Sequence, residues 1–363
     1  MSRSVVVIGT RGYPSYYGGF ETAVRRLAPF LADAGWDVNV YCREGQTKDD
    51  DEARDPRIRT TRTVGLESRS LSTLSFGLSS VLHALLHKPE VALVMNVANG
   101  FFLPLLKLRG IPTVVNVDGI EWERAKWNRF AKSVFRLGAR LTARYGTILI
   151  SDSLEIQRRW KRDFGRDSVF IPYGADLSGP CEVVPGLEEE SYVLMVARFV
   201  PENTVSEFFK AAELLAEQHP VVIVGSSGYG GPLDEAAERL AEHPNVQWLG
   251  HVSDDKKLLS LWHHSGAYFH GHSVGGTNPA LVQAMACGAP VVARRTPYNA
   301  EVLATEEHLV APEPVAIERA LRRMLTDHEL RAKARAANRD RAAIHYSWED
   351  VCQIGRASCR ERV

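Results

Sequence analysis

The segment with the clearest chemical potential reads FHGHSVGGTNPALVQAMACGAPVVA and spans residues 269–293. A polar loop containing Gly275 and Gly276 leads into Asn278 and Pro279, which favour a helix start because Asn caps and Pro fits the first turn. Backbone N–H groups and the positive dipole at such a start attract anions, and glycines let a ligand approach the backbone. The pattern predicts a diphosphate site, although a plain glycine loop before a capped helix also fits it.

Two further motifs add charged groups after strand-like runs. VARFVPENT, residues 196–204, places Arg198 at the end of such a run. Its guanidinium fork suits a diphosphate because it binds two oxygens, while a surface ion pair is the alternative. VVNVDGIEWERAKW, residues 114–127, places Asp118 at another run's end. That carboxylate is expected to bind or deprotonate a hydroxyl, or simply to close an Asx-turn.

The elements between these motifs alternate between buried strands and amphipathic helices. Expected helices cover residues 20–34, 205–217 and 279–287, and the alternation indicates parallel sheets covered on both faces. Residues 171–190 are rich in Pro, Gly and acids and lack periodicity, which is typical of a linker. Expected strands are residues 4–8, 38–41, 91–95, 113–117 and 147–150 before the linker, and 192–196, 221–224, 247–249, 267–270 and 291–293 after it.

These patterns predict two α/β domains, residues 1–176 and 177–353, with ligands at the carboxyl ends of the strands. The length of 363 residues agrees with two domains. Zero net charge does not favour a nucleic-acid binder. The five cysteines form no Cys-x-x-Cys pair and fit a reducing cytoplasm. The longest apolar stretch, residues 71–86, falls short of the ~20 residues of a membrane-spanning helix.

The stretch QAMACGAPVVA, residues 283–293, resembles the E-A-M-A-x-G-x-P-V-V-A segment of retaining glycosyltransferases of family 4. Members of that family have the GT-B fold, in which two Rossmann-like domains face each other across a cleft. The resemblance covers the chain from Ser4 to about Gln353. It implies sugar transfer from a nucleotide-diphosphate sugar donor, with retention and without metal or other cofactor.

The loop HGHSVGGTNP and the stretch DGIEWERAKW are similar, more narrowly, to bacterial rhamnosyltransferases of cell-surface polysaccharide assembly. This similarity implies dTDP-rhamnose as donor and a saccharide, often lipid-linked through a diphosphate, as acceptor. It also implies a place in the cytoplasm, at the inner face of the membrane. Two rivals are another GT-B enzyme, such as an epimerase or phosphorylase, and a non-catalytic nucleotide-sugar binder or partner subunit.

The resemblance assigns roles to individual residues, and Asp118 stands where many members have a histidine beside the reacting sugar. Catalysis falls to Asp118 and Arg198. Acceptor-side roles fall to Arg11, Tyr17, Glu21 and Glu121. The motif GTRGYPSYYGGFET, residues 9–22, contains Glu21 and the glycine pair Gly18 and Gly19, and it resembles the N-terminal loop of the family. Donor binding falls to Gly18, Gly19, Arg198, Asn203, Gly275, Gly276, Thr277, Asn278 and Gln283.

The chain departs from the family pattern at three of these positions. The family's two glutamates, separated by seven residues, are Gly275 and Gln283 here, and its lysine five residues after the arginine is Asn203. Backbone amides with Thr277 and Asn278 are expected to replace the first carboxylate. Gln283 keeps hydrogen-bonding capacity towards the donor ribose but loses charge.

Three features remain outside these motifs. Basic residues recur every three or four positions from Arg129 to Arg144, so they share a helix face that is either solvated or held by anionic membrane lipid. The histidines at 263, 264, 270 and 272 are expected to be structural rather than metal ligands. Residues 354–363 are expected to be a non-native tail that cuts short a last helix beginning in SWEDVCQ, which in the family crosses back onto the first domain.

Overall fold

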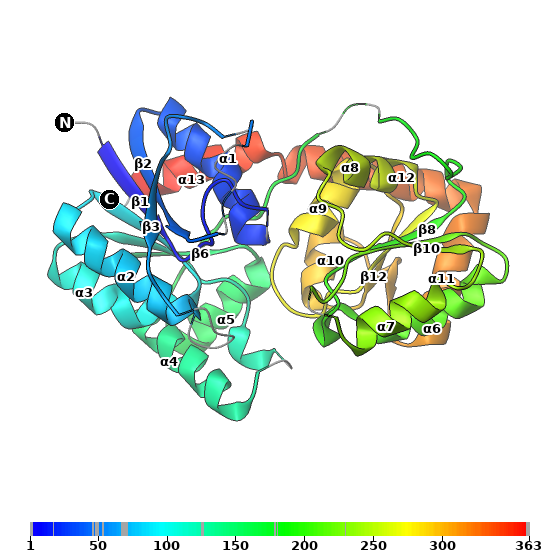
Figure 1. Ribbon diagram of the computed structural model, residues 1–363, viewed down its shortest axis with the longest axis horizontal. Coiled ribbons are helices and arrows are strands. Elements are labelled where there is room, and N and C mark those ends of the chain that lie inside the picture. Colours follow the sequence, from blue (N-terminus) through cyan, green and yellow to red (C-terminus); the bar gives the residue numbers. More distant parts are fainter. Residues whose placement is uncertain are drawn as a thin grey trace. The chain divides into compact units, whose positions relative to one another are not determined.

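The computed structural model describes residues 3–16, 18–45, 47, 51–52, 54–66, 72–124, 127–177, 179, 181–228 and 230–360. The chain divides into two compact units (Figure 1), Met1–Tyr173 with Trp348–Val363, and Gly174–Ser347. The predicted boundary after residue 176 therefore differs from the observed one by three residues. The last helix, which the prediction counted in residues 177–353 and expected to cross back onto the first domain, is grouped with the first unit.

In its described residues, the first unit contains a seven-stranded sheet in the order β3-β2-β1-β4-β5-β6-β7, with all neighbours parallel. The whole of β4, VALVM, is buried, as a sheet covered on both faces requires. The strands are Arg3–Ile8 (β1), Trp36–Arg43 (β2), Arg59–Thr63 (β3), Val91–Met95 (β4), Thr113–Asn116 (β5), Ile148–Ser151 (β6) and Val169–Phe170 (β7).

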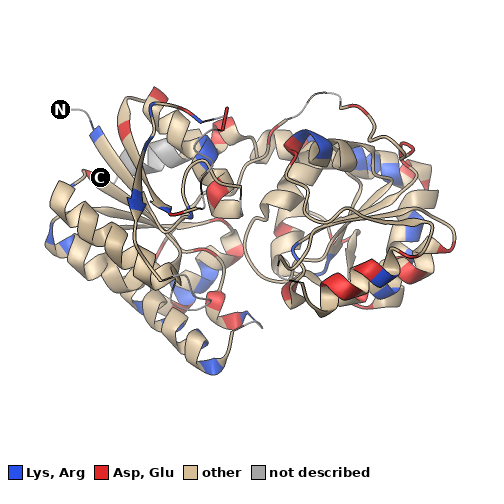
Figure 2. Cartoon of the chain, in the orientation of Figure 1, with Lys and Arg blue, Asp and Glu red and all other residues tan. Residues whose placement is uncertain are grey.

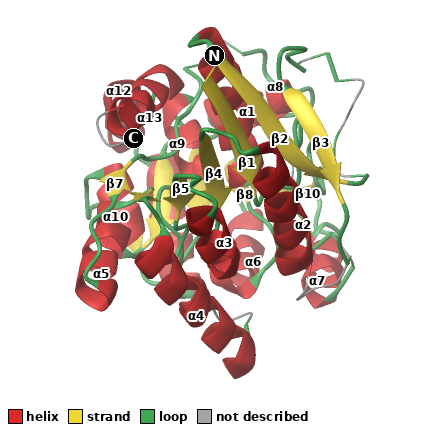
Figure 3. Ribbon diagram, turned by 90° about the vertical axis from the view of Figure 1, so that its left-hand side faces the viewer, coloured by secondary structure: helices red, strands yellow, loops and turns green. Residues whose placement is uncertain are grey.

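Helices cover both faces of this sheet (Figure 3). Helix α1 contributes Val24 and Ala28 to a core with Val5 and Val7 of β1, and it contacts α13. Helices α2, α3 and α4 form a layer in which neighbours contact each other. The helices are Gly19–Asp33 (α1), Ser72–His87 (α2), Val97–Phe102 (η1), Leu103–Leu108 (α3), Glu121–Glu123 (η2), Arg129–Tyr145 (α4), Leu154–Phe164 (α5) and Trp348–Arg360 (α13).

The second unit repeats the architecture with a six-stranded parallel sheet, traced through its described residues in the order β10-β9-β8-β11-β12-β13. Its strands are Val193–Val196 (β8), Val221–Val224 (β9), Val246–Trp248 (β10), Ala267–His270 (β11), Val291–Arg294 (β12) and Leu309–Val310 (β13). Its helices are Pro201–Asn203 (η3), Val205–Ala216 (α6), Pro232–Leu240 (α7), Asp255–His264 (α8), Pro279–Ala286 (α9), Pro297–Leu303 (α10), Pro314–Thr326 (α11) and His328–His345 (α12).

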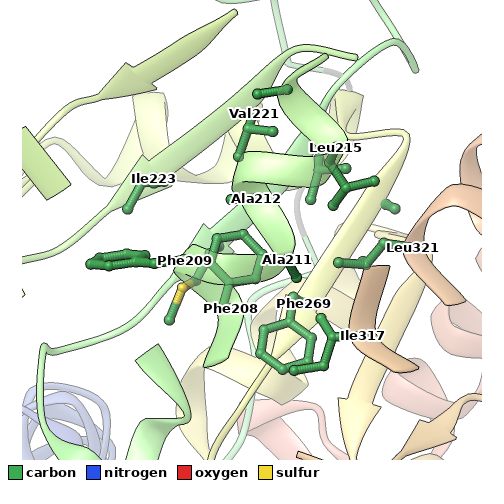
Figure 4. Packing of buried hydrophobic residues seen from close by; sticks show 14 of the residues in the cluster. Phe208, Phe209, Ala211, Ala212, Leu215, Val221, Ile223, Phe269, Ile317 and Leu321 are labelled. Carbon is green, nitrogen blue, oxygen red and sulfur yellow. The ribbon is translucent and has the colours of Figure 1, made fainter. Parts of the chain in front are cut away.

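Alternate residues of the central strands enter two separate cores of the second unit. Val193 and Met195 of β8 join one core, whereas Leu194 joins the other, because side chains alternate across a strand. In the first core, the rings of Phe208 from α6 and Phe269 from β11 are stacked with centroids 5.3 Å apart, and α11 packs beside them (Figure 4).

The expected strands at 91–95, 221–224 and 267–270 agree with the structure residue for residue, and the other seven agree within two residues at each end. Prediction missed β3, β7 and β13. The first reads RTTRT and lacks an apolar run, and the other two are only two residues long. Helix α13 continues through residue 360, so the foreign origin of the residues after Gln353 stays a prediction.

A glycine contact joins α4 to η1 in the first unit. A Cβ on Gly138 would lie 2.5 Å from the Val97 carbonyl oxygen, and one on Gly100 would overlap the Gly138 carbonyl. We expect Gly138→Ala to lower the free energy of unfolding by about 1–3 kcal/mol, because the added methyl group forces the two segments apart. Urea denaturation measures the change. Gly179→Ala, where nothing lies within 4 Å, is the control, and equal stability of both variants would contradict the expectation.

Candidate active site

Two loops at the carboxyl edge of the second sheet are held against each other. The first loop, residues 197–204, follows β8, and the second loop, residues 271–278, follows β11. Thr204 donates a hydrogen bond from Oγ1 to the Gly271 carbonyl at 2.6 Å. A Cβ on Gly271 would overlap the Asn203 carbonyl oxygen, so glycine is needed for this approach. The structure thus brings together the two motifs predicted to bind the donor.

Further hydrogen bonds fix the second loop. Ser273 donates from N at 2.9 Å and from Oγ at 2.8 Å to the Glu202 carbonyl of the first loop. From the other side, Asn299 donates from Nδ2 to the carbonyls of His272 at 3.0 Å and Arg294 at 2.8 Å. Both loops are therefore anchored through hydrogen bonds to backbone carbonyls.

Arg294, at the end of β12, is a cation that the sequence analysis missed. It is partly buried, and its Nη1 donates to Thr204 Oγ1 at 3.0 Å. Burial lowers the pKa of this guanidinium, against an opposing effect of Glu207. Its position was the available signal, because it directly follows the V-V-A of the recognised stretch at a strand end. Its guanidinium lies beside the joined loops and can offer further donors to an anion.

The side chains of Arg198 and Asn203 differ in burial and in hydrogen bonding. Asn203 is buried and donates from Nδ2 to the Arg198 carbonyl at 2.8 Å, so its amide closes the first loop. Its predicted contact with the donor stays a prediction. The Arg198 side chain is exposed and has no hydrogen bond or ion pair within the part of the chain that the structure describes. It is therefore available to a bound diphosphate.

The predicted helix start is confirmed. Asn278 accepts a hydrogen bond from the Ala280 N–H at 3.0 Å, and Pro279 is the first residue of α9. Gly275 has a φ of 108°, a conformation that favours glycine, and a Cβ there would meet no atom within 4 Å. The loop is therefore open at Gly275, whereas the next two residues, Gly276 and Thr277, are buried.

Gln283 binds the backbone of the segment that leads into the second unit. Its Oε1 accepts from the Asp176 N–H at 3.0 Å and its Nε2 donates to the Asp176 carbonyl at 2.9 Å. The adjacent Ala175 donates to the Tyr346 carbonyl at 2.6 Å. An amide can accept from the N–H and donate to the C=O of the same residue, whereas an ionised carboxylate can only accept. The predicted ribose contact stays a prediction.

Asp118 lies at the carboxyl edge of the first sheet, and Asn96 lies beside it. Asn96 and Asp118 have φ values of 68° and 59°, which cost energy in residues other than glycine and cluster at functional sites. Asn96 Nδ2 donates to Asp118 Oδ2 at 2.9 Å, and the Asx-turn is made by Asn116, whose Oδ1 accepts from the Asp118 N–H. Asp118 Oδ1 lies 3.9 Å from Arg124 Nη2.

Glu121 is paired with side chains close to it in the sequence. This buried carboxylate contacts Arg124 Nε at 2.5 Å through Oε1 and accepts from Trp127 Nε1 at 3.0 Å through Oε2. Arg124 therefore lies between Glu121 and Asp118. The geometry favours a supporting role for Glu121, which positions the arginine, and its predicted contact with an acceptor stays a prediction.

Glu21 similarly supports the loop between β1 and α1. Its buried Oε1 accepts from the Arg11 N–H at 2.9 Å. Gly18 is extended, with a φ of −171°, and precedes Gly19, the first residue of α1. Tyr17, the remaining predicted residue of this loop, lies outside the described residues.

The structure also gathers carboxylates about Tyr173, which sequence analysis did not select. Burial raises the pKa of Tyr173 well above its usual value, and the charges of Asp152, Asp118 and Glu21 raise it further. These side chains follow different strands, and parallel pairing brings them to one edge. In the described ranges, no group of three or more His, Cys, Asp or Glu side chains is placed to hold a metal ion.

Comparisons with known proteins bear on the fold and on the two domains of the chain. Residues 183–341 match the family Glycosyl transferases group 1, and residues 2–176 match a domain of unknown function, DUF1972. Sucrose-phosphate synthase from Thermosynechococcus elongatus is 18% identical with a TM-score of 0.80, over 99% of this chain and 98% of that one. A search of the curated proteins finds no match.

Two solved structures with sugar nucleotides share the fold. HepE from Anabaena, in complex with UDP-glucose, is 16% identical with a TM-score of 0.76, over 99% of this chain and all of that one. An E. coli structure described as trehalose-6-phosphate bound with UDP-2-fluoro glucose is 15% identical with a TM-score of 0.73, over the whole of both chains. The matched domain and the fold together support a glycosyltransferase with the GT-B fold.

The burial of His270 predicts that the second unit loses stability in acid. It is buried at the end of β11, bonded to Tyr268 and stacked on His272 at 4.4 Å, and burial lowers its pKa to about 3. Because the unfolded chain takes up this proton near pH 6.5 and the folded chain does not, stability is lost as pH falls from 6.5 towards 3. Urea denaturation between pH 6 and 4 measures how the free energy of unfolding depends on pH. We expect His270→Gln to reduce the slope of this dependence by about 1.4 kcal/mol per pH unit. Identical slopes for the variant and the unchanged chain would contradict this expectation.

Proposed function

We propose that this chain, a GT-B protein whose second half carries a glycosyl transferases group 1 domain, transfers a hexose or deoxyhexose from a nucleotide-diphosphate sugar. The acceptor is a saccharide or lipid-linked saccharide, and the reaction proceeds with retention in cell-surface polysaccharide synthesis. The observation that carries the proposal is the pair of joined loops beside Arg198, Arg294 and the capped start of α9.

The chemistry of the leaving group explains this arrangement. Breaking the bond between sugar and diphosphate leaves negative charge on the phosphate, and preorganised donors stabilise that charge best. Arg198 is exposed to bind it, Arg294 lies at the joined loops, and the start of α9 adds N–H groups. These groups supply the positive charge for a transfer that needs no metal ion. Binding of UDP-sugars by structural relatives supports the donor class.

On the acceptor side, Asp118 is the group proposed to contact the reacting hydroxyl. Asn96 holds one carboxylate oxygen and leaves the other facing Arg124. The carboxylate therefore has a fixed orientation in which it can accept a hydrogen bond from an acceptor hydroxyl. The resemblance to rhamnosyltransferases makes rhamnose from dTDP-rhamnose the preferred donor and a lipid-linked saccharide the preferred acceptor, at the cytoplasmic face of a membrane.

A donor-binding experiment tests the proposal. Thermal unfolding with dTDP, UDP, GDP and their sugar conjugates is expected to show a shift with dTDP-rhamnose, since a ligand at a hundredfold excess over its Kd stabilises the folded state by about 2.7 kcal/mol. Arg198→Gln and Arg294→Gln should each reduce the shift, because each removes a cation from the diphosphate.

Asp118→Asn is the matched variant in the other unit. It should keep the donor-induced shift and lose transfer to an added saccharide acceptor, because its neutral amide cannot take the hydroxyl proton. The absence of a shift with every donor, in a protein that unfolds cooperatively, would overturn the proposed function.

A second candidate function is a non-catalytic nucleotide-sugar binder, favoured by the commitment of Gln283 and Asn203 to backbone groups. Gln283→Glu discriminates between the two. We expect it to lower stability at pH 8 by about 1–3 kcal/mol, because a carboxylate cannot donate to the Asp176 carbonyl, and to regain part of that loss once acid protonates it. Transfer activity found solely in Gln283→Glu would favour the binder, whereas activity in the unchanged chain favours the enzyme.

A further inference from the structure

The layer formed by α2, α3 and α4 on one face of the first sheet has an unusual charge composition. These helices contain no Asp or Glu, although the chain has 44 acidic and 44 Lys or Arg residues in all. Figure 2 shows basic residues on this layer without intervening acids. Its basic residues are Lys107, Arg129, Lys132, Arg136, Arg140 and Arg144. We call these three helices the acid-free layer.

The helices of the acid-free layer are tied together at their carboxyl ends. Arg109, directly after α3, donates from Nε to the Leu85 carbonyl of α2 at 3.0 Å. Lys107 of α3 lies 5.9 Å from the ring centroid of Tyr145, the last residue of α4. The three helices therefore adjoin one another in the order α2, α3, α4.

The acid-free layer also exposes large apolar side chains. On α2, Leu78, Leu82 and Leu86 follow each other at intervals of four residues and form a stripe along one side of the helix, with Leu86 80% exposed. On α3, Leu105 is exposed and Leu108 is 88% exposed. Single exposed leucines are common, but a stripe of them indicates an interaction site.

Helix α4 extends the surface away from the sheet (Figure 3). Its buried residues, Gly138, Ala139 and Thr142, all lie in its second half. In the first half, Phe130 is 78% exposed and Leu137 is also exposed, among exposed arginines. From the sequence alone, the basic face of this helix fits contact with solvent and contact with a membrane equally well. The exposure of Phe130 and Leu137 favours contact with a membrane.

We propose that the acid-free layer is a docking surface for a bilayer that contains anionic lipid. Leucine and phenylalanine side chains gain free energy when they enter the boundary between headgroups and acyl chains, and arginines beside them bind anionic headgroups. The phosphates of a nucleic acid would pair with the arginines but would leave the leucine stripe exposed to water. A second copy of the chain would bring two basic surfaces together, which like-charge repulsion opposes.

The surface lies beside the acceptor-side residues of the same unit. Trp127, two residues before α4, donates to Glu121, and the Arg124 that contacts Glu121 also faces Asp118. A bilayer on the acid-free layer is therefore close to the loop that carries Asp118. This suits an acceptor held in the membrane, but docking itself does not depend on sugar transfer.

Vesicle co-sedimentation without any sugar donor or acceptor tests the inference. The chain is expected to bind vesicles of phosphatidylglycerol and phosphatidylcholine at least about tenfold more tightly than vesicles of phosphatidylcholine alone, and less tightly as salt increases. Arg129→Gln/Arg136→Gln/Arg140→Gln should weaken binding on the order of 100-fold. Phe130→Ser/Leu137→Ser should weaken it by about tenfold or more, because it removes the apolar anchor.

The matched control is Val315→Ser/Ile344→Ser, which removes two side chains of the second unit that are 58% and 68% exposed. It should bind vesicles like the unchanged chain, and equal thermal midpoints would show that all variants fold. Equal binding to neutral vesicles, no binding, or unchanged binding by both α4 variants would overturn the inference. So would duplex DNA binding that vesicles do not displace, or self-association that the α4 variants abolish. None of these readouts needs donor binding, so failure of the proposed function remains distinguishable.

Discussion

Parallel strand pairing is the constraint on which the rest of this structure depends. In each described sheet all paired strands run in the same direction, so their carboxyl ends emerge at one edge. In the second unit this edge collects the loops after β8 and β11 together with Arg294. In the first unit it collects Asn96, Asp118 and the carboxylates about Tyr173. Burial of both sheet faces makes the strands apolar, and thereby leaves chemistry to the loops.

Several polar side chains at these edges are hydrogen-bonded within the protein and stabilise the loops. A buried amide or carboxylate is stable when it is paired, and a loop that turns sharply leaves N–H and C=O groups that need partners. The structure meets both needs at once where such a side chain binds a loop's backbone. The side chains bonded to backbone groups are Glu21, Asn96, Asn203 and Gln283, and Glu121 is paired with the side chains of Arg124 and Trp127.

The chain departs from the family-4 pattern that it resembles and still has a guanidinium beside the joined loops. Asn203 closes a loop at the position where that pattern has a lysine, and Arg294 offers a guanidinium from the end of β12. Positive charge near a diphosphate is required by electrostatics, but its source along the sequence is not. In the first unit, the separation of basic from acidic residues is a property of the acid-free layer, even though the whole chain is neutral.

The two-sheet architecture, most strand positions and the capped start of α9 could be predicted from the sequence alone. These follow from local rules, since β-branched runs form buried strands and Asn-Pro starts a helix. The sequence also selected Arg198, Asp118 and the glycine loop, because each directly follows an apolar run. The tertiary structure alone decided which polar atoms are left for a ligand. Whether Asn203, Glu121 or Gln283 faces a donor, an acceptor or a carbonyl depends on partners up to 107 residues away. The exposed stripes of α2 and α3 likewise become one surface with α4 only when a parallel sheet places the three helices side by side.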